Sequence, residues 1–359
     1  MTKISISFLL ILNSIFLFAK NDLEKTRQKF NKYKSVSYTL TAFYPNPDTE
    51  IVTKFKTFYI INNYNSNKFD FYSKTGTDEE IFKNENYTSI NNEEKTFSQF
   101  EQKQNQEKLI NTSRIVQYGP TFILKYNWKY ENEVSINGLE HSHYSFIENI
   151  RKYGEKTIKT EFHIYISSKH LISKLERKNY IDDKLSQTVT FDYSEYNFSK
   201  KEIQFDSEPK RDYSLKYFER NEIKLLENST QAPNFTAIDT ENNEFSNRDL
   251  LGKNTLLLFS NTNCGASKEV SDLISNENFK LPSHLNLINF YTSDSNEIVK
   301  KYFKNKKSQF QIIANQKEIE KIFQISGYPV LYIVNDKGII TQSFYGLEPI
   351  ENYLKSTQN

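Results

Sequence analysis

The only cysteine of this chain, Cys264, lies between an apolar run and a segment that favours a helix. The run, Thr255 to Phe259, is short and uninterrupted, as is typical of a buried strand, and the helical segment covers residues 268–274. A thiol at a helix N-terminus faces free backbone N–H groups and the positive end of the helix dipole, and both favour the thiolate. The order strand, loop, cysteine and helix therefore predicts an α/β domain with a reactive sulfur at Cys264.

The N-terminus is typical of a secretory signal peptide over residues 1–19. Lys3 is followed by a largely apolar stretch from Ile4 to Phe18, and Ala19 precedes charged sequence. The stretch is short for a membrane-spanning helix. A buried N-terminal helix is the alternative. We therefore expect an exported protein, periplasmic as in Gram-negative bacteria or secreted, that is soluble after signal removal and does not span a membrane.

A single cysteine is unusual in an exported protein, because structural disulfides join cysteines in pairs. An internal disulfide is excluded here, so Cys264 indicates either intermolecular pairing or a reactive thiol. The charges are nearly balanced, with 47 Lys and Arg against 45 Asp and Glu. Such a balance gives no strong attraction to nucleic acid, and we expect no nucleic-acid partner.

Residues 20–220 have the pattern of a large antiparallel sheet with one buried face. An amphipathic helix is predicted over residues 22–33 and a helical excursion over residues 106–126. Short segments of alternating polarity predict strands, and polar turns separate several of them. These predicted strands cover residues 37–43, 54–60, 68–72, 87–90, 161–166, 172–177 and 187–193.

This region resembles the LolA-like fold of bacterial lipoprotein carriers. The resemblance rests on the order of the opening helix, the Lys68–Phe71 phrase, the segment Tyr87–Lys95 and the late run from Phe162 to Tyr193. It implies a curved antiparallel half-barrel with helices on its concave side, and an acyl or apolar ligand held there. A closed core and a protein-binding platform remain alternatives. We expect residues 221–230 to form a linker.

Two histidines, at positions 141 and 143, are candidate metal ligands. His141 and His143 would project from the same face of a strand, a geometry compatible with a metal. His163 and His170 lie far along the chain, and no cysteine is near. Two ligands make a weak site, so we interpret these residues as surface histidines and expect no metal.

Residues 231–359 resemble the periplasmic thioredoxin-like proteins of the TlpA and redoxin type. The resemblance is carried by Ala232–Phe235, by Phe259–Glu269 around the cysteine, and by Ile325–Ile340. It implies a mixed sheet with flanking helices, so the whole chain combines an α+β and an α/β part. It also implies that Pro329 is cis and packs beside the cysteine, with Tyr328 offering its backbone to an extended substrate.

The active-site segment departs from that family at several positions. Ser267 stands where the second cysteine is expected and cannot release a mixed disulfide, but its hydroxyl can donate a hydrogen bond to the Cys264 thiolate. Asn263 replaces an aromatic residue and Ala266 replaces a proline. The peroxiredoxin pattern also fails, because Asn261 stands where a threonine is expected.

The sequence leaves three functions open. In the first, Cys264 and Ser267 form a monothiol site for thiol–disulfide exchange, with Asn263, Gly327, Tyr328 and Pro329 contacting substrate. The partner would be a client protein with a thiol or disulfide, or a small thiol, and no cofactor is expected. In the second, the thioredoxin-like domain has lost catalysis and serves as a binding module. In the third, the LolA-like domain is a carrier. Whether the chain is an enzyme stays open.

Overall fold

The computed structural model describes residues 22–66, 68–100, 103–153, 156–206, 208–217, 223–304, 306 and 308–358. The predicted signal peptide lies outside these ranges. The described residues divide into two compact units, one formed by residues 22–47 and 52–217 and the other by residues 48–51 and those from 223 onward. We call them the N-terminal unit and the C-terminal unit and describe each by itself.

The N-terminal unit is built on one sheet of twelve strands. Their order is β12-β6-β5-β4-β3-β2-β1-β11-β10-β9-β8-β7, and every neighbouring pair is antiparallel except β12 with β6. The strands are β1 (Ser35–Pro45), β2 (Val52–Asn62), β3 (Asp70–Thr75), β4 (Asp78–Lys83), β5 (Asn86–Asn91), β6 (Thr96–Gln99), β7 (Lys129–Ile136), β8 (Leu139–Tyr153), β9 (Lys156–Ser167), β10 (Ile172–Ile181), β11 (Lys184–Ser199) and β12 (Ser214–Tyr217).

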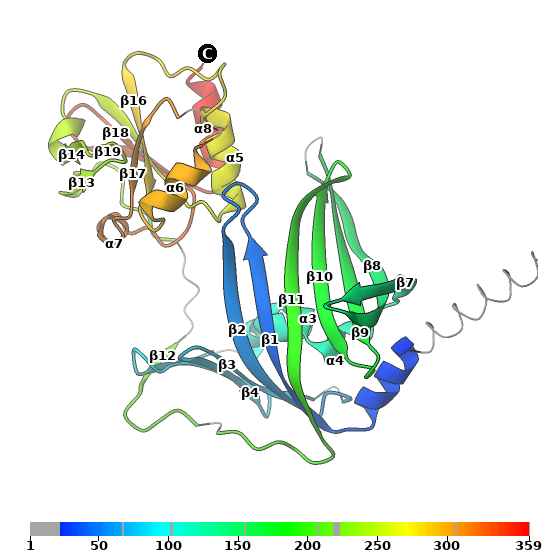
Figure 1. The fold of residues 1–359 in the computed structure, drawn as a ribbon. Coiled ribbons are helices and arrows are strands. Elements are labelled where there is room, and N and C mark those ends of the chain that lie inside the picture. The colour runs from blue at the N-terminus through cyan, green and yellow to red at the C-terminus, as the bar shows by residue number, and fades with distance from the viewer. Residues whose placement is uncertain are drawn as a thin grey trace, which may run out of the picture. The chain divides into compact units, whose positions relative to one another are not determined.

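Helices cover one face of this sheet. Residues 22–31 are helical, and α2 (Lys103–Thr112), α3 (Arg114–Tyr118) and α4 (Pro120–Ile123) form the predicted excursion. Figure 1 shows α3 and α4 on one side of β1, β10 and β11. Gly119 separates α3 from α4. A larger residue does not fit there, because a Cβ on Gly119 would lie 2.2 Å from the Ile115 carbonyl oxygen.

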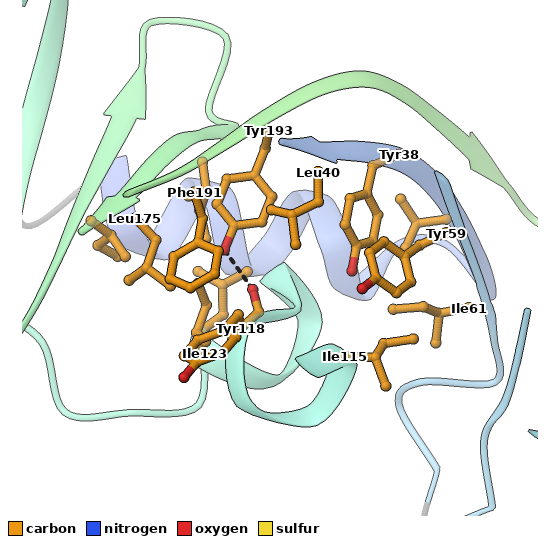
Figure 2. Close-up of a cluster of buried hydrophobic side chains, with 14 of the residues drawn as sticks. Tyr38, Leu40, Tyr59, Ile61, Ile115, Tyr118, Ile123, Leu175, Phe191 and Tyr193 are labelled. Carbon is orange, nitrogen blue, oxygen red and sulfur yellow. Dashed lines mark hydrogen bonds between the residues drawn. The ribbon is translucent and has the colours of Figure 1, made fainter. Parts of the chain in front are cut away.

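The core of the N-terminal unit is rich in aromatic residues. Tyr118 of α3 stacks on Phe191 of β11 with ring centroids 4.3 Å apart, and Tyr38 stacks on Tyr59 at 5.2 Å (Figure 2). The hydroxyl of Tyr193 donates to the Tyr118 carbonyl, which fixes α3 to the sheet. Side chains of the chain itself therefore fill the space between these strands and α3.

The sequence predicted the strands with strong apolar alternation and missed others. Each predicted strand overlaps an observed one, from β1 to β11. Strands β4, β6, β7, β8 and β12 were not predicted. The reason is visible in β7, where no residue is buried, and in β8, whose distal half is exposed. The exposed parts of these strands are held mainly by backbone pairing with their neighbours, whereas Tyr130, Tyr144 and Phe146 pack on the core.

The C-terminal unit contains a mixed five-stranded sheet of order β17-β16-β15-β18-β19 and a β13-β14 hairpin. Strands β15, β16 and β17 are parallel, whereas β18 and β19 are antiparallel to their neighbours. The elements are β13 (Thr236–Ile238), β14 (Glu244–Ser246), η1 (Asn247–Leu250), β15 (Asn254–Phe259), α5 (Gly265–Ile274), β16 (Leu285–Tyr291), α6 (Asn296–Tyr302), β17 (Gln311–Ala314), α7 (Glu318–Ile322), β18 (Val330–Val334), β19 (Ile340–Tyr345) and α8 (Leu347–Ser356).

Strand β15 is buried on both faces, as its uninterrupted apolar run predicts. Leu257 and Phe259 pack in one cluster with residues of α7 and the β13-β14 hairpin, and Leu256 and Leu258 pack in another with α5 and α8. Phe259 stacks on Phe290 with centroids 4.6 Å apart. This double burial fixes the end of β15 and hence the loop that leads to Cys264.

The segment expected to be a linker includes residues that pack on the C-terminal unit. The Ser229 N–H donates to the Ile340 carbonyl at 2.7 Å, and the Ile340 N–H donates to Thr230 at 2.9 Å. Leu225 and Leu226 contact the apolar cluster around Phe259. The described part of this segment, from residue 223 onward, therefore packs as part of the C-terminal unit, which starts earlier in the chain than residue 231.

Candidate functional site

Cys264 lies at the start of α5, in the position directly before the first helical residue. Its backbone is extended, with φ −97° and ψ 118°, and its carbonyl accepts the Lys268 N–H at 2.9 Å. The helix begins at Gly265, three residues earlier than the sequence predicted, so the sulfur is at the helix N-terminus itself. The side chain is half-buried and carries a free thiol.

The thiol contacts the loop that precedes β18. Cys264 Sγ lies 3.6 Å from the Tyr328 carbonyl oxygen and donates to it, which requires the protonated thiol. The Tyr328–Pro329 peptide bond is cis, and Pro329 is buried. Three of the site residues named from sequence, Cys264, Tyr328 and Pro329, therefore lie together although the chain separates them by 64 residues.

Ser267 and Asn263 have different surroundings. Ser267 is fully buried, and its hydroxyl accepts the Asn261 N–H at 3.3 Å. The expected hydrogen bond to Cys264 is thus replaced by one that holds the loop before the cysteine. Asn263 is exposed, and its N–H donates to the Asn261 side chain at 2.9 Å.

Gly327 is enclosed rather than open to a substrate. A Cβ on this residue would lie 2.8 Å from Ile223 Cδ1 and 3.1 Å from the Tyr345 ring. A side chain at this position would make Ile223 or Tyr345 shift, because both approach the backbone closely. Its proposed contact with substrate would require Ile223 to move.

Two carboxylates that the sequence did not single out lie at this site. Glu320 of α7 is 7% exposed and accepts hydrogen bonds from Thr292 Oγ1 at 2.7 Å, from Ser293 Oγ at 2.8 Å and from the Tyr328 hydroxyl. Burial raises the pKa of Tyr328, and its hydrogen bond to Glu320 raises it further. The tyrosine therefore stays a neutral donor, and Glu320 holds the loop whose carbonyl contacts Cys264.

Asp294 anchors the loop on the other side of the cysteine. Its two oxygens accept the Thr262 N–H at 2.9 Å and the Thr262 hydroxyl at 2.8 Å. Burial raises the pKa of Asp294, the bonds from Thr262 lower it, and the charge of Glu320 raises it, with a net increase. Acidic and hydroxyl residues after a buried parallel strand are the signal that could have drawn attention to residues 292–294.

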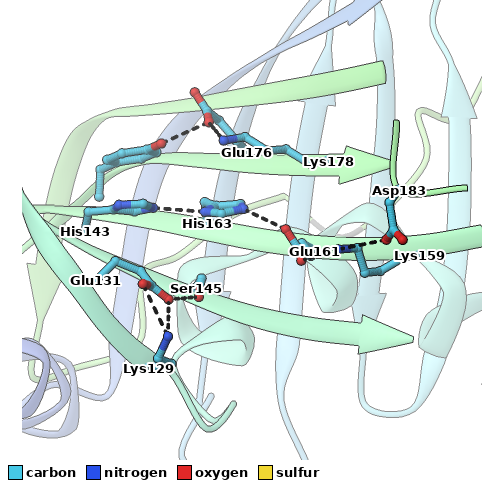
Figure 3. A network of polar contacts seen from close by, with 11 residues as sticks. Lys129, Glu131, His143, Ser145, Lys159, Glu161, His163, Glu176, Lys178 and Asp183 are labelled. Atoms are coloured by element: carbon cyan, nitrogen blue, oxygen red, sulfur yellow. Dashed lines mark hydrogen bonds and ion pairs between the residues drawn. The ribbon is translucent and has the colours of Figure 1, made fainter. Parts of the chain in front are cut away.

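A second polar cluster lies on the other face of the N-terminal sheet, away from α3 and α4 (Figure 3). The ring nitrogens of His143 and His163 are 2.9 Å apart, and His163 Nε2 is 3.5 Å from Glu161. Burial lowers the pKa of both histidines. The sequence placed His163 far from His143, but the pairing of β8 with β9 brings them together.

The other expectations for the histidines were also incomplete. His141 is buried, with its Nδ1 2.8 Å from the Leu139 carbonyl, and is no surface histidine. Among the residues that the structure describes, no group of three or more His, Cys, Asp or Glu side chains could hold a metal ion. Within the same ranges, no helix has the length and apolar content needed to cross a membrane.

The comparison with known protein families finds a match in the C-terminal unit. Residues 229–343 match the AhpC/TSA family. Together with the strand–cysteine–helix arrangement, this match supports a thioredoxin-like, redoxin-type domain in this part of the chain. No curated protein gives a significant match.

Solved structures that are similar to this chain cover about a third of it. A putative thiol:disulfide interchange protein DsbE from Chlorobium tepidum is 14% identical, covers 37% of this chain and 99% of its own, and has a TM-score of 0.33. The thioredoxin domain of a thiol-disulfide oxidoreductase from Bacteroides vulgatus is 23% identical over 37% and 99%, with a TM-score of 0.33. StoA from Bacillus subtilis is 22% identical over 34% and 96%, with a TM-score of 0.30.

Proposed function

We propose that this chain is an exported protein that uses the Cys264 thiol for thiol–disulfide exchange with a client protein or a small thiol. The observation that carries the proposal is the position of Cys264 Sγ at the α5 N-terminus, 3.6 Å from the Tyr328 carbonyl beside Pro329. The proposed order of the chain is a signal peptide at 1–19, a LolA-like domain at 20–220, a linker at 221–230 and the thioredoxin-like domain at 231–359.

The exchange needs an external thiol. The Cys264 thiolate attacks one sulfur of a client disulfide, a new S–S bond forms, and the other client sulfur leaves as a thiolate that takes a proton. A second thiolate from outside the chain then attacks the client sulfur of the mixed disulfide. This step returns Cys264 as a thiolate and leaves the client joined to the external sulfur. Ser267 takes no part as a nucleophile, and its role is to hold Asn261 and the loop.

Glutathione disulfide and intact-mass measurement test the proposal on the folded chain. The wild type is expected to gain one glutathione on Cys264 and to lose it on addition of a dithiol. Cys264→Ser is expected to gain none. Ser267→Ala keeps the thiol and should still form the adduct. Modification of the wild type only after unfolding would contradict the proposal.

That contrary result would favour a second function, in which the thioredoxin-like domain is a binding module. The observation in its favour is the burial of Ser267, which leaves the site one half-buried sulfur that donates to a backbone carbonyl. A thiol that reacts only in the unfolded chain is structural. Formation of the glutathione adduct on the folded wild type would argue against a domain that only binds partners.

A further inference from the structure

A cavity of about 520 Å³ lies in the N-terminal unit, where strands β2 to β5 face α2 and the start of α3. Its size is within the range of small-molecule sites. It lies beside the aromatic core of Figure 2, and Tyr59 contributes to both. The cavity is independent of Cys264 and of the thiol chemistry proposed above.

The floor of the cavity carries buried hydroxyls that fix a carboxylate. Thr57, Ser73 and Tyr87 are each buried, and the Thr57 hydroxyl is 2.6 Å from that of Thr75. Ser73 Oγ and the Tyr87 hydroxyl donate to the two oxygens of Glu80, at 3.0 and 2.8 Å. A carboxylate accepts about four hydrogen bonds. Because Glu80 is exposed within the cavity lining, it keeps acceptor capacity for a ligand.

A guanidinium lines the same cavity. Arg114 lies over the rings of Phe55 at 4.9 Å and Tyr44 at 5.4 Å, measured from its central carbon to the ring centroids. Among the described residues, Arg114 forms no ion pair. Stacking on aromatic rings holds the plane of a guanidinium and leaves its N–H donors pointing outward at the edges.

The opposite charges of Glu80 and Arg114 both affect the pKa of Tyr59, a residue that lines the cavity. Burial raises the pKa of Tyr59, the negative charge of Glu80 raises it further, and the positive charge of Arg114 lowers it. Both charged groups are therefore near the Tyr59 side chain. Burying either one under a ligand costs free energy unless the ligand supplies the opposite charge.

We propose that this cavity binds a small zwitterion, a free amino acid or a short peptide, with its ammonium group on Glu80 and its carboxylate on Arg114. An acyl chain, the ligand that the LolA-like resemblance implies, would leave both charges uncompensated. A ligand that carries a single charge would compensate one of these groups and leave the other uncompensated. The hydroxyls of Thr57 and Thr75 provide further hydrogen bonds to the peptide groups between the two ends.

Titration calorimetry on the full chain tests the inference, with tri-alanine as the probe. Tri-alanine is expected to bind, and its N-acetylated amide, which lacks both charges, is expected to bind at least about tenfold more weakly. Laurate serves as the apolar probe and is expected not to compete. Glu80→Gln and Arg114→Met each remove one charge and should each weaken binding of tri-alanine by about tenfold or more.

Glu79→Gln is the matched control. Glu79 neighbours Glu80 in β4, pairs with Lys74 at 3.2 Å, and does not line this cavity. Its binding should match the wild type. Equal binding of tri-alanine and its neutral form, competition by laurate, or no heat at about 10 mM peptide would overturn the inference. If Glu80→Gln fails to fold by circular dichroism, the exposed Arg114→Met decides alone, since unchanged binding there contradicts the assignment.

Discussion

The two units differ in where most of their buried polar side chains lie. In the C-terminal unit, most of them, such as Thr262, Asp294 and Glu320, lie in loops and helices, and the strands carry fewer, among them Thr255 of β15 and Asn289 of β16. In the N-terminal unit, buried hydroxyls such as Thr57 and Ser73 lie within the strands themselves. Polar groups gathered in loops after apolar strands leave a local signal in the sequence, whereas groups dispersed over neighbouring strands do not.

The largest expected effect separates the two cores. Phe259→Ala is expected to destabilise the C-terminal unit by about 3–5 kcal/mol, because it removes a fully buried ring that stacks on Phe290. Phe191→Ala is the matched change in the N-terminal unit, where the ring is equally buried. The chain has one tryptophan and one cysteine, so Trp128 fluorescence follows one unit and thiol reactivity of Cys264 follows the other in urea.

Each variant should shift the transition of its own unit. If Phe259→Ala moved the Trp128 transition as far as the Cys264 transition, the units would unfold as one cooperative body. The comparison between two separate cores would then fail.

A smaller effect tests whether polar groups within strands hold the N-terminal unit. Tyr193→Phe removes the hydroxyl that donates to the Tyr118 carbonyl and leaves that buried acceptor unpaired. We expect a loss of about 1–3 kcal/mol in the unfolding free energy reported by Trp128. Tyr33→Phe, at a half-buried tyrosine of the same unit whose hydroxyl forms no hydrogen bond among the described residues, should change stability little. Equal effects of the two changes would show that the hydroxyl of Tyr193 contributes nothing specific.

The smallest expected effect is the change of folding stability with pH, which has opposite signs in the two units. Burial lowers the pKa of His163 below its ordinary value of 6.5, so the unfolded chain binds more protons there and the N-terminal unit loses stability as pH falls below 6.5. The pKa of Asp294 is raised above 3.8 by burial, so the folded C-terminal unit binds more protons and gains stability as pH falls toward 3.8.

Unfolding in urea at several pH values between about 4 and 7 measures both slopes. His163→Gln should flatten the slope reported by Trp128, and Asp294→Asn should flatten the slope reported by Cys264. His143 has a lowered pKa as well, so His163→Gln is expected to leave part of the dependence. Slopes unchanged in both variants would mean that other groups set the response of each unit to acid.

The sequence by itself determined the local features of this protein. The run Thr255–Phe259 formed the buried strand β15, the next helix placed Cys264 at its N-terminus, and the alternation in β1, β2, β9 and β11 gave the central strands. These features follow from residues close together in the chain, because side-chain periodicity and a helix start are set locally.

Only the tertiary structure decided which distant residues meet. Ile223 covers Gly327, Glu320 holds Tyr328, and His163 reaches His143 through the pairing of β9 with β8. The exposed parts of β7 and β8 form because neighbouring backbones pair, and the residues of those parts carry no apolar face that would predict the pairing. Long-range register determines the cavity and the surroundings of Cys264, since each combines side chains that are local to different elements.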